Sequence, residues 1–144
     1  MSWFAQSISW VLIVAGWMVI NNQNNRRETR KEVRASLLEL YKFLDEIEDS
    51  AYEYHTTDGD TGKARKILRA IQQIAPRIIM ARRGPIVFHY TKALTNFRRA
   101  ITFENFDTST FERKRPEDPF FDAIAAAKRE LITALELAYS QAYP

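Results

Sequence analysis

Few side chains in this sequence could carry out acid–base, nucleophilic or metal chemistry. Cysteine is absent, which excludes disulfides, thiolate catalysis and cysteine-ligated metals among these residues. The two histidines are His55 and His89. His55 precedes Asp58 and Asp60, but no further ligand cluster accompanies these three residues, and a solvated turn is the simpler interpretation. We therefore expect no metal and no cofactor.

Arg83 and His89 enclose the segment RGPIVFH. Their spacing resembles the loose Arg-x4–6-His pattern of HEPN-type ribonucleases, which are also helical bundles. The resemblance implies that Arg83 would hold a scissile phosphate while His89, carried by the helix that follows, would act as acid or base. Gly84, where that family usually has a polar residue, and Pro85 depart from the pattern. We predict a protein that is not an enzyme, with this ribonuclease as the alternative and His89 as a partly buried structural residue.

An uncharged stretch from Trp3 to Ile20 is followed by five amides, Asn21 to Asn25. As an α-helix the stretch would be about 27 Å long, close to the hydrocarbon thickness of a bilayer. A secretory signal peptide would need a positive segment before it and a small-residue cleavage site after it, and the sequence has neither. A buried core helix is the second alternative, because the stretch contains the polar Gln6, Ser7 and Ser9. We predict a single transmembrane anchor.

The cations behind this stretch predict its orientation. Arg and Lys next to a spanning helix stay on the cytoplasmic side, which would leave the N-terminus outside. The expected domains are an anchor at 1–20, an amide-rich and basic juxtamembrane segment at 21–34, and a cytoplasmic helical bundle at 35–144. The expected location is the inner membrane. The cations expected to contact its anionic inner leaflet are Arg26, Arg27, Arg30, Lys31 and Arg34.

Tryptophans recur every seven residues in the stretch, at Trp3, Trp10 and Trp17. This spacing places them along one side of a helix, with Ser9 and Gly16 in a small-residue stripe beside them. Small residues let membrane helices approach closely, so we predict that this surface packs against other helices, in self-association or on another membrane protein. Exposure of the tryptophans to lipid is the alternative.

Low glycine and proline content, 4 and 5 residues, predicts an all-α fold. Turn and capping residues break the chain at 56–62, and apolar periodicity predicts a second helix at 64–81, kinked or restarted at Pro76. A third helix is predicted from Ile86 to about Glu104. The first helix carries an apolar seam with alternating spacings of four and three, at Val33, Leu37, Leu40, Leu44, Ile47, Ala51 and Tyr54.

The last helix is predicted to start at Pro119, behind Asp118 as N-cap, and to run to about Tyr143. The polar connection before it, 105–117, contains Phe106 and Phe111 as expected tethers to the core. Short connections make successive helices antiparallel. The predicted fold is therefore an up-down antiparallel four-helix bundle that continues from the transmembrane helix.

Acidic residues are absent between Lys63 and Phe103, where cations are frequent. The first helix is acidic from Glu39 onward, so charge complementarity between the first two helices is one interpretation. The other is a basic surface for an anionic partner, lipid or acidic protein rather than nucleic acid, because the nearby aromatics fall on the predicted core face. The residues expected to dock this partner are Lys63, Arg65, Lys66, Arg69, Arg82, Arg83, Arg98 and Arg99.

These features predict a single-pass, membrane-anchored interaction protein that docks an unidentified protein partner at the cytoplasmic face and associates with itself. The layout is similar to that of small single-pass proteins of bacterial mobile elements, which implies an accessory or effector role in a defence or toxin system. The alternatives are a membrane-tethered ribonuclease toxin and an oligomerising effector that disrupts membranes.

Overall fold

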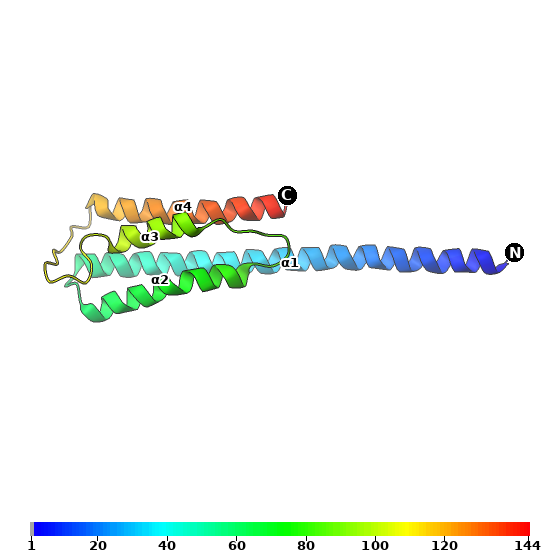
Figure 1. Cartoon of the computed structure of the whole chain (residues 1–144), viewed down its shortest axis with the longest axis horizontal. Coiled ribbons are helices and arrows are strands. Elements are labelled where there is room, and N and C mark those ends of the chain that lie inside the picture. The colour runs from blue at the N-terminus through cyan, green and yellow to red at the C-terminus, as the bar shows by residue number, and fades with distance from the viewer. Residues whose placement is uncertain (1) are drawn as a thin grey trace.

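The computed structural model describes residues 2–144, with side chains described at residue 10 and from residue 12 onward. Within these residues the chain forms four helices and no strand: α1 (Ser2–Thr56), α2 (Thr61–Ala81), α3 (Thr91–Thr102) and α4 (Pro119–Ala142). Successive helices run in opposite directions (Figure 1). The all-α, up-down four-helix bundle predicted from the sequence is confirmed.

Helix α1 is much longer than the bundle that it belongs to. Its 55 residues extend about 80 Å at a rise of 1.5 Å per residue. Its second half packs against the other helices, whereas its first half projects alone beyond the end of the bundle (Figure 1). We call this projecting part, residues 2–24, the arm. The helix continues through Asn21–Asn25, so these amides do not separate the arm from the bundle.

The predicted transmembrane anchor at residues 1–20 is wrong. Among the residues that the structure describes, no helix has an apolar stretch long enough to cross a membrane. The inner-membrane location, the outside N-terminus and the single-pass topology were derived from that anchor and are corrected with it.

The core is built on the predicted seam of α1. All seven seam residues from Val33 to Tyr54 are buried. Helix α2 packs along α1, α4 packs along α1, and α3 packs along α4. The inward residues of the other helices are also those that periodicity predicts, among them Ile67, Ile71, Ile74, Phe97, Ile101, Ile124, Leu131 and Leu135.

Local sequence explains where α2 and α4 begin. The carboxylate of Asp60 accepts a hydrogen bond from Lys63 N at 3.0 Å and starts α2. Asp118 accepts one from Phe120 N at 2.9 Å ahead of Pro119, which confirms the predicted start of α4. Pro76 lies inside α2, which neither ends nor restarts there.

Helix α3 begins later than predicted. It starts at Thr91, and the segment before it is not helical. Gly84 has a φ of +66°, and a Cβ atom there would lie 3.1 Å from Tyr143 Oη, so the chain turns tightly at this point. Ile86 is buried in the core from this non-helical segment. Its burial anchors the connection and delays the helix.

Packing against the seam gives a quantitative prediction for Leu135, the residue of α4 that lies in the same core. Leu135 is 0% exposed and Leu137 is 57% exposed, so the two residues form a matched pair on one helix. We expect Leu135→Ala to lower the free energy of unfolding by about 2–5 kcal/mol because it leaves a cavity. Leu137→Ala should change it by less than about 0.5 kcal/mol. Urea unfolding of both variants measures the difference, and equal effects would contradict this core.

Candidate interaction surfaces

The arm carries a large apolar surface that no other part of the described chain covers. Trp10 is 67% exposed and Trp17 is 65% exposed. The aliphatic residues between Leu12 and Ile20 that are exposed with them are Leu12, Ile13, Val14, Met18, Val19 and Ile20. These positions follow one another along the sequence and so surround the helix on all sides. The apolar surface is therefore not a stripe.

The predicted packing residues of the arm are only partly described. Trp10 and Trp17 are exposed, and nothing lies within 4 Å of a Cβ atom built on Gly16. Because Gly16 has no side chain, the helix surface is low at this position and another helix can approach it closely. Trp3 and Ser9 lie outside the described side chains.

At the base of the arm, one arginine ties α1 to α4. Arg34 forms an ion pair with Glu136 at 2.5 Å and lies over the ring of Tyr139. The hydroxyl of Tyr41 donates to the same carboxylate at 2.7 Å. Burial, and then the hydrogen bond to Glu136, hold the pKa of Tyr41 far above its ordinary value. The guanidinium of Arg34 is thus already engaged by Glu136 and Tyr139 of α4.

The other cations at the base are less engaged. Arg30 donates to Tyr139 Oη at 3.4 Å. Within the described part of the chain, Arg26, Arg27 and Lys31 have no carboxylate within ion-pair distance. The contact with an anionic leaflet predicted for these cations and Arg34 stays a prediction. A groove of about 460 Å³ lies here, lined by Arg27, Arg30, Lys31, Arg34, Ala35, Leu38 and Tyr139.

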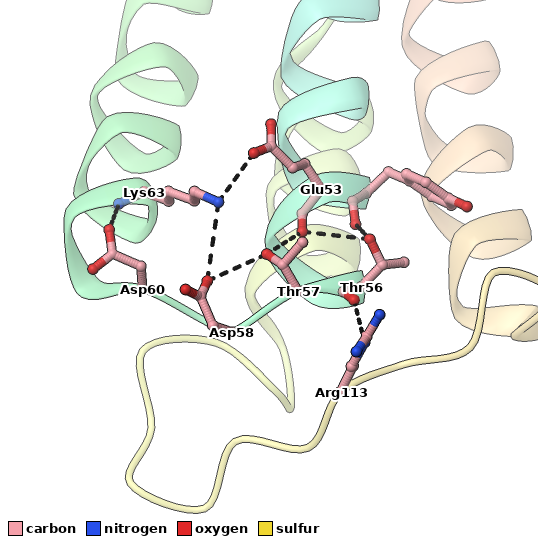
Figure 2. Close-up of polar contacts among 8 residues, drawn as sticks. Glu53, Thr56, Thr57, Asp58, Asp60, Lys63 and Arg113 are labelled. Atoms are coloured by element: carbon pink, nitrogen blue, oxygen red, sulfur yellow. Dashed lines mark hydrogen bonds and ion pairs between the residues drawn. The ribbon is translucent and has the colours of Figure 1, made fainter.

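The structure divides the cations predicted to dock an anionic partner. Lys63 pairs with Glu53 at 3.0 Å and Asp58 at 3.9 Å (Figure 2), and Arg83 pairs with Glu32 at 2.6 Å. The α2 cations lie on the helix that packs against α1, and the α3 cations lie on the helix that packs against α4. The other cations of the predicted docking set form no ion pair with the described residues: Arg65, Lys66, Arg69, Arg82, Arg98 and Arg99.

The two residues of the ribonuclease pattern are not arranged as the resemblance implies. Glu32 engages the guanidinium of Arg83. His89 is exposed and lies before α3, which begins at Thr91. The expectations that a helix carries His89 and that its side chain is partly buried are both wrong.

His55 is completely buried, in contrast to the solvated turn expected for it. Its Nε2–H donates to the carbonyl oxygen of Ile101 at 3.2 Å, and its Nδ1 accepts from the amide of Asn105 at 3.4 Å. The Ile101 carbonyl can only accept and the Asn105 amide nitrogen can only donate, so Nε2 carries the proton, Nδ1 does not, and the ring is neutral. Burial lowers the pKa of His55, against the opposing effect of the Ile101 hydrogen bond. Among the described residues no group of side chains could hold a metal ion.

The connection between α3 and α4 closes over the end of α1. Arg113 Nε donates to the carbonyl of Thr56 at 2.5 Å (Figure 2), and Lys114 N donates to that of His55 at 2.7 Å. These donors satisfy carbonyls that a helix end leaves free. The side chain of Asn105 exchanges two hydrogen bonds with the backbone of Glu112. The connection is therefore an ordered cap.

Aromatic side chains fix this cap to the core. Phe106 and Phe111 pack around Tyr54, with ring centroids 5.0 and 5.4 Å from it, which confirms both predicted tethers. Phe111 lies against Gly59, where a Cβ atom would be 2.6 Å from the ring and φ is +62°. Only glycine suits this position. Phe120 meets the ring of His55 edge-on at 4.5 Å.

Comparison of the chain with protein-family models, with curated proteins and with solved structures found no match.

The buried neutral His55 predicts a pH dependence of stability. In the unfolded chain it takes up a proton near its ordinary pKa of 6.5, whereas in the folded chain its pKa is lower. The unfolded state therefore binds more protons as the pH falls below 6.5, and the free energy of unfolding should fall by up to about 1.4 kcal/mol per pH unit. Above that pH this contribution is fully present.

Urea unfolding between about pH 7.5 and 5.5 tests this, since carboxylates titrate mostly below that window. His89→Gln removes the exposed histidine and should leave the slope unchanged. His55→Gln should be less stable and should lose the slope. The same slope in both variants would contradict a neutral, buried His55.

Proposed function

We propose that this chain is a non-enzymatic helical interaction protein whose arm assembles with the arms of further copies. The observation that supports it is the exposed apolar surface around the arm from Trp10 to Ile20. A helix that is apolar on every side is normally surrounded by neighbours, because water disfavours such a surface. Nothing else in the described chain supplies those neighbours.

The size of this surface argues for an interface. Each tryptophan can bury about 150–250 Å², and six aliphatic side chains are exposed beside Trp10 and Trp17. The total exceeds the few hundred Å² that monomeric proteins usually leave exposed in one patch. Its burial, at about 25 cal/mol per Å², is enough to drive association.

Further copies of the chain are the occupants that fit best. Every copy presents the same uncharged segment, so arms meet without electrostatic repulsion between Leu12 and Ile20. The seven-residue spacing of Trp10 and Trp17 suits helices that pack along one another. The charged positions begin at Arg26, where the basic clusters of several copies would repel each other. The region in which the arms pack together should therefore end before Arg26.

The bundle is then free to dock a second kind of partner, an acidic protein. The unpaired cations Arg65, Lys66 and Arg69 follow one another along the exposed side of α2. Opposite charge on a partner would favour its docking there. A role in a bacterial defence or toxin system stays a prediction from the sequence layout.

Sedimentation velocity of the full chain in detergent-free buffer tests the arm assembly. We expect a concentration-dependent oligomer for the unmodified chain. The variant Trp10→Ser with Trp17→Ser should sediment as a smaller species, because it removes two large exposed side chains of the arm without touching the core. The control Ile79→Ser with Leu137→Ser replaces two bundle residues that are exposed to a similar degree, 62% and 57%, and should not change the oligomer.

Tryptophan fluorescence gives a second readout, because burial of the arm shifts the emission to shorter wavelength. A chain that stays monomeric at all concentrations, or that leaves solution only with added phospholipid vesicles, would show that arms do not associate with one another. An oligomer unaffected by the tryptophan substitutions would place the interface elsewhere.

A further inference from the structure

One exposed line of side chains on α1 has a symmetric charge pattern. The line is centred on Leu38, which is 52% exposed although it is a large apolar residue. Lys31 and Asp45 lie seven residues before and after Leu38, and Arg27 and Asp49 lie eleven residues before and after it. Seven and eleven residues are close to two and three helical turns, so all five share one side of the helix.

This side of α1 is open along its length. Arg27, Lys31, Leu38, Asp45 and Asp49 are all exposed, whereas the seam residues of α1 that form the core are buried. Arg27, Lys31 and Asp49 have no ion-pair partner among the described residues. Asp45 accepts from Lys128 at 2.6 Å but keeps 60% of its side chain exposed. The charges are therefore available to a second molecule.

We propose that a second copy of this chain packs antiparallel against this line, with a two-fold axis at Leu38. The rotation brings Lys31 of each copy to Asp45 of the other, and Arg27 of each to Asp49 of the other. Leu38 then meets Leu38 on the axis. The arrangement is isologous, since each contact occurs twice.

The groove at the base of the arm supports this pairing. Arg27, Lys31, Ala35 and Leu38 line it together with Tyr139, which gives cations beside an apolar floor. The turn of α1 from Asp45 to Asp49 is the acidic, helical segment that the same rotation brings there. The rotation also places Lys42 of each copy opposite Arg34 of the other, a like-charged contact that occurs twice and is moderated because Arg34 already holds Glu136.

This interface is separate from the arm, and it does not depend on arm assembly. The antiparallel arrangement points the two arms in opposite directions, away from the shared face. Each exposed ion pair contributes up to about fivefold in affinity, and less at high salt. The dimer should therefore weaken as ionic strength rises, whereas an apolar arm interface should not.

Charge reversal in the full chain tests the proposal. The parent is the Trp10→Ser, Trp17→Ser variant, so that the arm does not contribute, and its dimer is measured by sedimentation at low ionic strength. Arg27→Glu alone opposes two carboxylates, and Asp49→Arg alone opposes two guanidinium groups. Each should weaken the dimer at least about tenfold. An equal mixture of the two should restore it, because the heterodimer regains opposite charges at both places.

Arg65→Glu is the matched control, an exposed arginine on α2, and should leave the dimer unchanged. A monomeric parent, or a mixture that does not recover, would overturn the proposal without touching the arm assembly.

Cross-linking gives an independent check, because the chain has no cysteine of its own. Leu38→Cys lies on the axis and should form a disulfide-linked dimer under mild oxidation. Asp49→Cys should not, since the two copies of residue 49 would lie about 33 Å apart in the antiparallel arrangement. Efficient cross-linking at both positions would indicate parallel helices and contradict the proposal.

Discussion

Burial of the α1 seam is the interaction on which the rest of the structure depends. The residues from Val33 to Tyr54 give α2 and α4 their common packing surface, and α3 reaches the core through α4. The C-terminal end of α1 accepts hydrogen bonds from the connection between α3 and α4, at the carbonyl oxygens of His55 and Thr56. A single helix thus supplies the spine of the core, the anchor of its longest connection, and the arm that extends outside it.

Many of the charges that look free in the sequence are cross-links between helices. Arg34 joins α1 to α4 through Glu136, and Arg83 joins the end of α2 to Glu32 on α1. Lys128 of α4 holds Asp45 and Glu48 of α1. Burial opposes the charge of Lys128, but the hydrogen bonds to the two carboxylates outweigh it and raise its pKa. The segregation of charge along the sequence therefore serves the bundle first, and only the remaining charges are available to partners.

The sequence alone predicts the parts of this fold that depend on neighbours in sequence. Periodicity identifies the seam and the inward faces, and capping chemistry identifies Asp118. It fails where distant segments decide the outcome. His55 is buried only because a connection about fifty residues later folds over it, and Asn105 was missed for the same reason. The sequence does hold a signal for the burial of this connection, the phenylalanines at 106, 111, 120 and 121, because large apolar side chains favour packing against a core. The membrane anchor was predicted from hydropathy and flanking charges, which do not separate a spanning helix from an apolar arm.

The continuity of α1 has a mechanical consequence. With no glycine or proline between Trp17 and Thr56, the helix is a stiff rod, and the angular position of the arm is locked to that of the core seam. One residue added or removed among the amides would turn the tryptophans by about 100° relative to the bundle. A rotation of the arm about its axis would likewise be passed to the core, because one continuous helix joins the two.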